Sequence, residues 1–252
     1  MKKVTRGECR GWKIGDRPSV ISKKISQFEM GNSKWRSRSV RSSGGNLRHL
    51  GSFALFWFAV FLAACGANSQ LENQFSSGRQ ALLTGNYESA LGYFQRVAQQ
   101  DPNYVSAAEP VQGVWTYVGI AQYSTGNLAQ ARETLERAVS QPQRADVARL
   151  YLGLTLARLN ERQKGLQDIE TGLRGIHNFL DYMNETYRYG IGQFYDPRRT
   201  IRSAIEKAQA TISNGNIDWP QLLSEGERIG VEIEEEGDRA RKQQLMDQRD
   251  QM

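Results

Sequence analysis

Few side chains after residue 64 could act as nucleophiles, metal ligands or general bases. Residues 65–252 contain one cysteine, Cys65, and one histidine, His177. A Ser-His-Asp or Cys-His catalytic group would have to use His177, and no G-x-S-x-G motif supplies a nucleophile. A zinc site needs several Cys or His ligands, so no metal and no dissociable cofactor is expected. We interpret His177 as a helix-terminus or packing residue.

Two other motifs could do chemistry, but each has a simpler interpretation. Gly190-Ile191-Gly192 is too short for a phosphate-binding loop and follows no predicted strand, so it indicates a hinge or turn. Glu234-Glu235-Glu236 could form a metal or acid/base cluster. Consecutive residues of a helix point in different directions, however, so a solvated helix face is favoured. The sequence therefore predicts a protein that is not an enzyme.

Cys65 is the residue with the most specific surroundings. Leu62-Ala63-Ala64 precedes it, and the uncharged apolar run 52–62 comes before that, with Lys and Arg residues upstream. This pattern resembles the lipobox of bacterial lipoproteins. The resemblance implies cleavage before Cys65, covalent acylation of its thiol (palmitate among the chains) and attachment to a membrane. Gly66, in place of Asp, resembles the class sorted to the periplasmic face of the outer membrane. The alternative is an uncleaved signal anchor.

The charge of the chain is divided unequally by this motif. Residues 1–64, the predicted leader, hold 13 of the 33 Lys and Arg residues but only 3 of the 27 Asp and Glu residues. Residues 65–252 thus carry 20 basic and 24 acidic residues, a net charge of −4, which gives no electrostatic basis for nucleic-acid binding. The leader is long, and Met30 is a plausible internal start. Residues 65–70 form the predicted lipidated tether.

Three segments of the mature chain repeat one another. They align on Gly78, Gly119 and Gly153, at spacings of 41 and 34 residues, and a Gly-Asn pair follows the first two glycines by seven residues. The pattern resembles the tetratricopeptide repeat (TPR), whose period is 34 residues. The third segment is degenerate. The resemblance implies an all-α, TPR-like solenoid of about three helix pairs over residues 71–175. Capping helices and a polar tail would follow over 176–252; generic amphipathic helices are the alternative.

In TPR proteins the first helix of each pair lines a concave groove. Mapped onto this sequence, the resemblance gives an apolar groove with two arginines at its rim. A partner's helix or extended peptide could fill it, or the protein's own C-terminal helices could. The predicted groove consists of Phe75, Arg79, Leu82, Thr116, Ile120, Tyr123, Leu150, Leu154 and Arg158.

The C-terminal region carries helix-start signals and an aromatic cluster. Asp196-Pro197 and Asp218-Trp219-Pro220 are typical of helix beginnings, and fraying is expected after about Arg241. Most of the aromatic residues should pack inside, with one or two tyrosines exposed. The cluster comprises Phe179, Tyr182, Tyr187, Tyr189, Phe194 and Tyr195.

These features lead to one principal functional expectation and two alternatives. The principal one is a lipid-anchored TPR scaffold or adaptor that binds a protein of the cell envelope during complex assembly. One alternative is an enzyme of envelope polymer metabolism with its site in residues 176–252, which would require a cleft with converging carboxylates. The other is a purely structural lipoprotein whose groove is filled internally.

Overall fold

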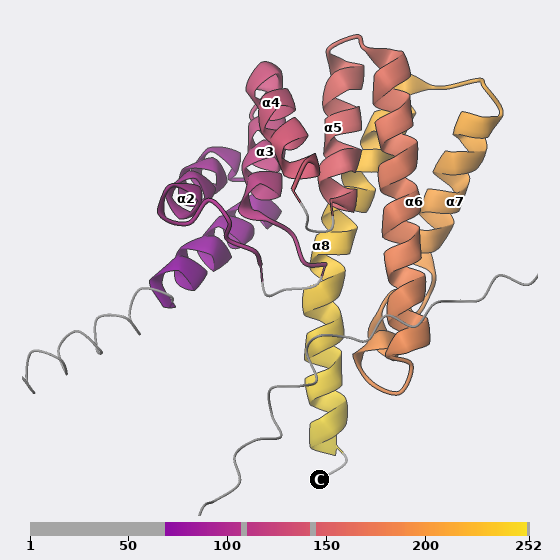
Figure 1. Ribbon diagram of the computed structural model, residues 1–252. Helices are drawn as coiled ribbons and strands as arrows, with labels where there is room; N and C mark the ends of the chain where they lie inside the picture. Colours follow the sequence, from indigo (N-terminus) through magenta and orange to yellow (C-terminus); the bar gives the residue numbers. More distant parts are fainter. Residues whose placement is uncertain (1–68, 107–109, 142–144, 251–252) are drawn as a thin grey trace, which may run out of the picture. The chain divides into compact units, whose positions relative to one another are not determined.

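The described part of the chain is helical apart from short connections. The computed structural model describes residues 69–106, 110–141 and 145–250, all within one unit, Ser52–Met252. Among these residues no strand forms beyond an isolated bridge between Val105 and Gly113. The all-α prediction is confirmed, whereas Cys65 and the leader lie outside the described residues. The elements are a first helix at 69–83, α2 (Tyr87–Gln100), α3 (Val114–Ser124), α4 (Leu128–Val139), α5 (Asp146–Arg158), α6 (Arg162–Thr186), the short 3-10 helix η1 (Ile191–Phe194), α7 (Thr200–Ser213) and α8 (Trp219–Asp250) (Figure 1).

Three of the turns between consecutive helices share one hydrogen-bonding pattern. Gly85, Gly126 and Asn160 have positive φ angles of 78°, 81° and 66°. In all three turns the amide of the next residue donates to the carbonyl oxygen five residues earlier. A left-handed residue closed by this bond ends a helix as a Schellman motif. The three turn residues lie 41 and 34 positions apart, which is also the spacing of the glycines that define the predicted repeats.

Within the helix pairs, glycines allow close contact. A Cβ atom placed on Gly78 would lie 2.7 Å from the Phe94 ring of α2. One placed on Gly153 of α5 would lie only 2.5 Å from the backbone nitrogen of Ile169 in α6. Side chains do not approach backbone so closely, so α5 and α6 pack this tightly only because residue 153 is glycine. The α5–α6 pair, which the degenerate third segment forms, therefore has closer backbone contact than the pair of the first helix and α2.

Two adjoining apolar clusters fill the interior of the described unit. The first is aromatic, with the Phe75 ring centroid 5.6 Å from Phe94 and 4.8 Å from Tyr117. The second is centred on α5 and α6 and continues into α7 and α8. Leu82 and Trp115 pack against both clusters. The C-terminal helices are thus packed onto the helix pairs through apolar side chains.

Helices α6, α7 and α8 extend the fold beyond the predicted repeats. Helix α6 continues without a break past residue 176, where the repeat pattern of the sequence fades. Helix α8 begins at Trp219, and Asp218 accepts a hydrogen bond from the Gln221 amide at its start. It continues to Asp250, past Arg241, and its last turns extend beyond the neighbouring helices (Figure 1). Ion pairs four residues apart on its exposed side support this length.

Candidate functional site on the inner face of the helix pairs

The predicted groove residues come from three helices, the first helix, α3 and α5, but most of them are not open to solvent. Arg79 and Leu82 are partly buried, and Arg158 is exposed. The remaining six are Phe75, Thr116, Ile120, Tyr123, Leu150 and Leu154, and each is at most 3% exposed. Phe75 belongs to the aromatic core and does not line an open face.

The predicted groove residues of the first helix, α3 and α5 form what we call the inner face of the helix pairs. Helix α8 covers the middle of this inner face. A Cβ placed on Gly226 would lie 2.8 Å from the Leu154 side chain, and one on Gly230 would lie 2.6 Å from the Tyr151 ring. The two glycines lie four residues apart, on one side of α8, and let its backbone approach α5. Of the two occupants expected from the sequence, the structure places the protein's own C-terminal helix in this part of the groove.

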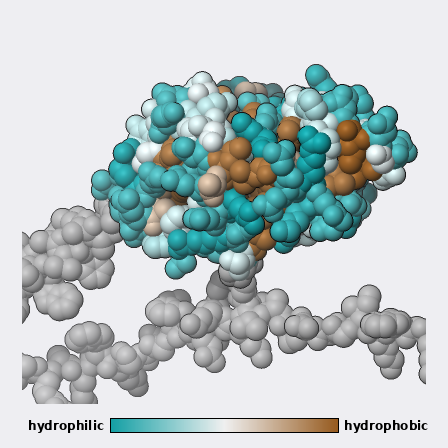
Figure 2. Space-filling view, turned by 90° about the horizontal axis from the view of Figure 1, so that it is seen from above, coloured by the Kyte–Doolittle hydropathy of each residue, from teal (hydrophilic) through white to brown (hydrophobic). Residues whose placement is uncertain are grey.

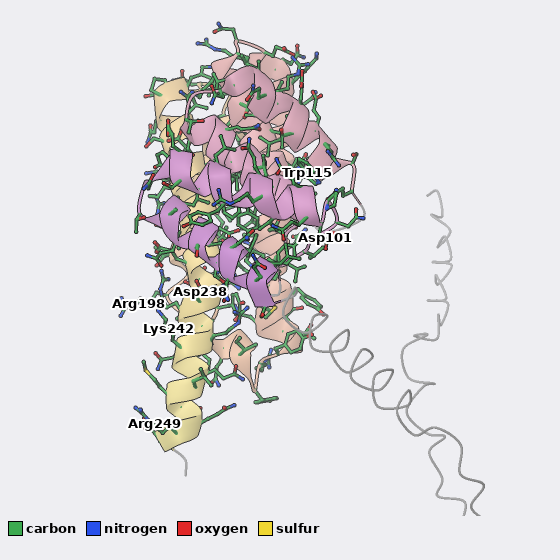
Figure 3. All side chains as sticks on the ribbon, turned by 90° about the vertical axis from the view of Figure 1, so that its left-hand side faces the viewer. Asp101, Trp115, Arg198, Asp238, Lys242 and Arg249 are labelled. Carbon is green, nitrogen blue, oxygen red and sulfur yellow. The ribbon has the colours of Figure 1, made fainter. Side chains whose placement is uncertain are left out.

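Polar contacts hold α8 against the first helix and α3. The Arg79 guanidinium donates to Asp238 at 3.2 Å and to the backbone oxygen of Glu234 at 3.0 Å. The Tyr117 hydroxyl donates to Glu234 Oε2 at 2.9 Å, and the Tyr123 hydroxyl donates to Glu227. In Figure 3, α8 passes behind the first helices, with Asp238 near its crossing with them. These contacts join segments more than a hundred residues apart in the chain.

Glu234 is an ionisable group in an apolar setting. Its side chain is 5% exposed, and its Oε1 atom has no hydrogen-bond partner among the described residues. Burial raises the pKa of Glu234 to about 7, although Arg79 and the Tyr117 hydroxyl favour its charged form. The interpretation of Glu234-Glu235-Glu236 as a solvated face is therefore wrong for two of the three residues, since Glu234 is 4% and Glu236 1% exposed.

Part of the predicted groove remains open as a cleft beside α8. We call it the α8 cleft; its volume is about 590 Å³. Four predicted groove residues line it: Leu82, Ile120, Tyr123 and Arg158. Tyr87 and Val231, which are 39% and 43% exposed, lie at its opening. Its wall on the α8 side includes Glu227, Gly230, Val231 and Glu234.

Comparison of the chain with protein-family models, with curated proteins and with solved structures finds no match. No described helix combines the length and the apolar character needed to cross a membrane. The face of the molecule shown in Figure 2 is mostly hydrophilic, with hydrophobic residues in separate patches.

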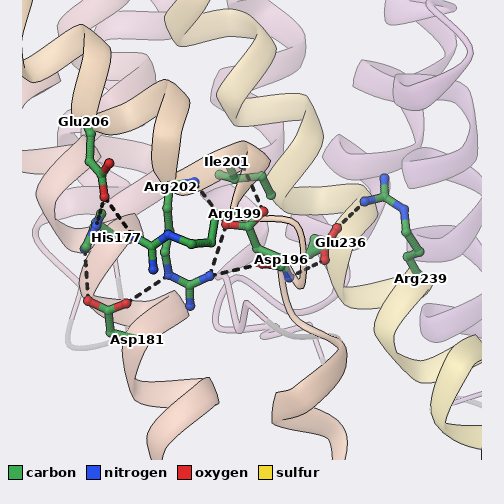
Figure 4. A network of polar contacts seen from close by, with 9 residues as sticks. All are labelled: His177, Asp181, Asp196, Arg199, Ile201, Arg202, Glu206, Glu236 and Arg239. Carbon is green, nitrogen blue, oxygen red and sulfur yellow. Dashed lines mark hydrogen bonds and ion pairs between the residues drawn. The ribbon is translucent and has the colours of Figure 1, made fainter.

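A second polar site lies on the opposite side of α8, where α6, α7 and the η1–α7 loop meet (Figure 4). Arg202 is 1% exposed and donates to Asp181 at 2.9 Å and to Asp196 at 3.1 Å. Asp196 also accepts hydrogen bonds from the amides of Ile201 and Arg202 in the first turn of α7. His177 lies in the middle of α6, between Asp181 and Glu206, and not at a helix terminus. The arrangement binds the C-terminal helices together.

A cleft of about 680 Å³ adjoins this network. It is lined by four carboxylates, which is the feature expected of an enzyme in residues 176–252. Each carboxylate pairs with an arginine, however. Burial raises the pKa of Glu236, while its hydrogen bond from the Asp196 amide and its ion pair with Arg239 act in the opposite direction and favour the charged form. No cluster of three or more His, Cys, Asp or Glu residues suited to a metal ion occurs in the described part of the chain. The four carboxylates are Asp196, Glu232, Glu235 and Glu236.

The aromatic cluster near η1 is divided between packing and exposure. Phe179 and Tyr195 are buried and pack edge to face, with ring centroids 5.7 Å apart. Tyr182, Tyr187 and Tyr189 are 48%, 47% and 95% exposed. Three tyrosines are therefore exposed, where one or two were expected. They lie at and after the end of α6, where less of the helical core surrounds them.

The sequence allowed the C-terminal helices to fill the groove, but it did not indicate which residues would form that contact. The residues it missed include Tyr117, Tyr151, Glu227 and Glu234. One signal was present in the sequence: Gly226 and Gly230 are four residues apart on a helix, beside acidic residues at 227, 234 and 238. A glycine stripe next to carboxylates indicates a helix side that contacts another helix closely and needs hydrogen-bond donors from it.

Proposed function

We propose that this protein is a lipid-anchored scaffold of the cell envelope, attached through Cys65 and sorted to the outer membrane. Its TPR-type helix pairs would present the α8 cleft to a segment of a partner protein. The observation that supports the repeat assignment best is the turn geometry. Left-handed residues with the same Schellman hydrogen bond recur at spacings of 41 and 34 residues, in register with the small residues of the predicted repeats.

The α8 cleft supports a binding role better than a catalytic one. Its wall combines aliphatic side chains with Tyr87 and Tyr123, a composition typical of peptide-binding surfaces. It retains four of the predicted groove residues, whereas α8 packs against Leu150 and Leu154 and Phe75 belongs to the aromatic core. A segment that docks there would therefore contact both the repeats and α8.

Site-specific photo-crosslinking in whole cells tests this proposal. A photoreactive residue at Tyr87 or Val231, which line the α8 cleft, should capture a discrete envelope protein. The same residue at Arg174, on an exposed part of α6, should not capture it. Capture of the same products at Arg174, or of none at the two cleft positions, would argue for a purely structural role.

The anchor needs its own test, because it is independent of the cleft. Changing Cys65 to Ser removes the thiol that would be acylated, so labelling with a fatty-acid analogue should be lost and the protein should leave the membrane fraction. The measurement is fractionation of cells that express the variant or the parent chain. Retention of a cleaved Cys65→Ser protein in the membrane would refute the lipid anchor.

A further inference from the structure

The α8 cleft contains a buried carboxyl group with an unsatisfied oxygen. Glu234 lines the cleft with a side chain that is 5% exposed, and its Oε1 has no hydrogen-bond partner among the described residues. A buried acceptor without a donor costs free energy, and a ligand that supplies the donor recovers it. The feature thus points to what the cleft binds.

We infer that the α8 cleft binds a basic side chain, a lysine ammonium or an arginine guanidinium, carried by the docked segment of a partner protein, with Glu234 and Glu227 as its carboxylate ligands. This inference rests on the proposed docking role. It adds the chemistry by which the partner would be recognised.

The cation already next to Glu234 is committed elsewhere. Arg79 Nε lies 3.6 Å from Glu234 Oε2, while its terminal nitrogens donate to Asp238 and to the Glu234 backbone oxygen. Tyr117 donates to Oε2 as well. Neither Arg79 nor Tyr117 therefore bonds Oε1: both lie against Oε2, and Arg79 also bonds Asp238 and the Glu234 backbone oxygen. Oε1 is the oxygen left for a ligand.

The charges lining the cleft favour a cationic ligand over an anionic one. Glu227, Glu234 and Arg158 are its charged residues. Arg158 is held over the Tyr123 ring, with its guanidinium carbon 4.8 Å from the ring centroid. An anion would face two carboxylates, whereas an ammonium or guanidinium would face two acceptors and be repelled by one cation at the rim.

The apolar part of the wall suits the stem of such a side chain. Leu82, Ile120 and Val231 line the same cleft and would contact the methylene groups of lysine or arginine. Tyr87, at the opening, offers a ring face on which a cation can lie. The site therefore matches both ends of a long basic side chain.

The charged and titratable groups that face Glu234 come from every helix around it. They are Arg79 from the first helix, Tyr117 from α3, Tyr151 from α5 and Asp238 from α8 itself. Burial outweighs Arg79 and keeps the pKa of Glu234 at about 7. A cation binds the ionised carboxylate, so affinity should rise as the pH increases through this value and level off above it.

Methyl NMR of the full chain in non-ionic detergent provides the test, with Ile120 and Val231 as reporters in the cleft. The probes are Nα-acetyl-lysine methylamide and its uncharged counterpart, Nα-acetyl-norleucine methylamide. At pH 8 the lysine probe should bind about tenfold more tightly than the norleucine probe. At pH 6 this advantage should largely disappear. Equal binding of the two probes at pH 8 would overturn the inference.

Three variants assign the effect to the cleft. Glu234→Gln should abolish the lysine preference and its pH dependence, and Glu227→Gln, which leaves Glu234 intact, should weaken the preference several-fold. Glu235→Gln removes the same charge from the neighbouring position of α8, outside this cleft, and should leave the preference unchanged. A lysine preference that survives in both cleft variants would refute the assignment. A partner still crosslinked at Tyr87 without a lysine preference would leave the docking role standing and this inference overturned.

Discussion

Two buried glutamates on α8 lie two residues apart and serve opposite sides of the helix. Glu236 is 1% exposed, and its two carboxyl oxygens are bound by the Asp196 amide and by Arg239. Glu234 is 4% exposed, and only one of its carboxyl oxygens has a donor. Burial raises the pKa of both. Both carboxyl oxygens of Glu236 thus have donors, whereas Glu234 keeps one unused acceptor.

The difference indicates two tasks for one helix. The Glu236 side joins α8 to the η1–α7 loop, where Arg202 and Asp196 complete a closed network. The Glu234 side lies over the helix pairs, where a cleft remains beside it. A saturated network stabilises the fold, and an unsaturated one leaves free energy to be gained on binding. Variants on the two sides of α8 test this contrast.

The largest effect is expected on the closed side. Arg202→Met removes a buried guanidinium and leaves Asp196, whose side chain is 2% exposed, without its cation. Loss of one partner of a buried ion pair should lower the free energy of unfolding by about 3–5 kcal/mol. Urea denaturation measures this loss. Arg199→Met, at an exposed ion pair nearby, is the control and should cost under about 1 kcal/mol. Equal losses in the two variants would contradict the contrast.

The next effect concerns Glu234 and has a defined direction with pH. Between the ordinary carboxyl pKa, near 4.5, and about 7 the folded protein holds more protons than the unfolded chain at this site. The free energy of unfolding should therefore fall as the pH rises through this range and then level off. Glu234→Gln should remove about 2–3 kcal/mol of this fall and be more stable than the parent at pH 8.

Urea unfolding at pH 5, 6, 7 and 8 provides the measurement for this variant. Any dependence of the free energy of unfolding on pH that remains in this variant should come from other groups with raised pKa values, Glu236 among them. Glu235→Gln, on the same helix, should keep the parent slope. A Glu234→Gln protein that is less stable than the parent at pH 8 would contradict this prediction. It would show that the Arg79–Glu234 ion pair stabilises the fold by more than the burial of the charged carboxylate costs.

A smaller change should follow from removing the donor to Glu234. Tyr117→Phe takes away the hydroxyl that favours the ionised carboxylate, so the pKa of Glu234 should rise further. The free energy of unfolding at pH 8 should fall by about 1 kcal/mol. Carboxyl ¹³C NMR titration follows the pKa directly. Tyr189→Phe, at a tyrosine that is 95% exposed, should change neither quantity.

The smallest effect is expected where α8 faces solvent. Arg228 pairs with Glu225 and Glu232 within its own helix, and its side chain is 41% exposed. Arg228→Ala should alter the free energy of unfolding by under about 0.5 kcal/mol, because exposed pairs are screened by water and salt. Denaturation at low and high salt measures it. A loss comparable to that of Arg202→Met would remove the distinction between the sides of α8.

Much of the helical framework could be predicted from the sequence because its signals are local. Gly85 and Gly126 mark turns that need a left-handed residue, and these turns occur there. The third turn uses Asn160, which tolerates the same conformation but is a weaker signal in a sequence. Asp218 marks the start of α8 for a similarly local reason, since its carboxylate accepts from an amide three residues later.

The candidate site was predicted less completely. The sequence identified Ile120 and Tyr123 as groove residues, and both line the α8 cleft. It placed Phe75 in the groove as well, although this ring is in the aromatic core. Neither the burial of Glu234 nor its pKa follows from its neighbours in the chain. They depend on residues distant in the chain that surround it, among them Tyr117 and Arg79, which lie 117 and 155 residues away.

By itself, the sequence determined an all-helical chain with repeated turns, because hydrophobic period and turn chemistry are properties of short segments. Only the tertiary structure decided that α8 covers the middle of the inner face and leaves a cleft beside Glu234. The physical reason is that burial of an apolar face can be satisfied by any complementary surface. Which surface does so depends on where the chain brings α8, and that position is set by the packing of α5, α6 and α7.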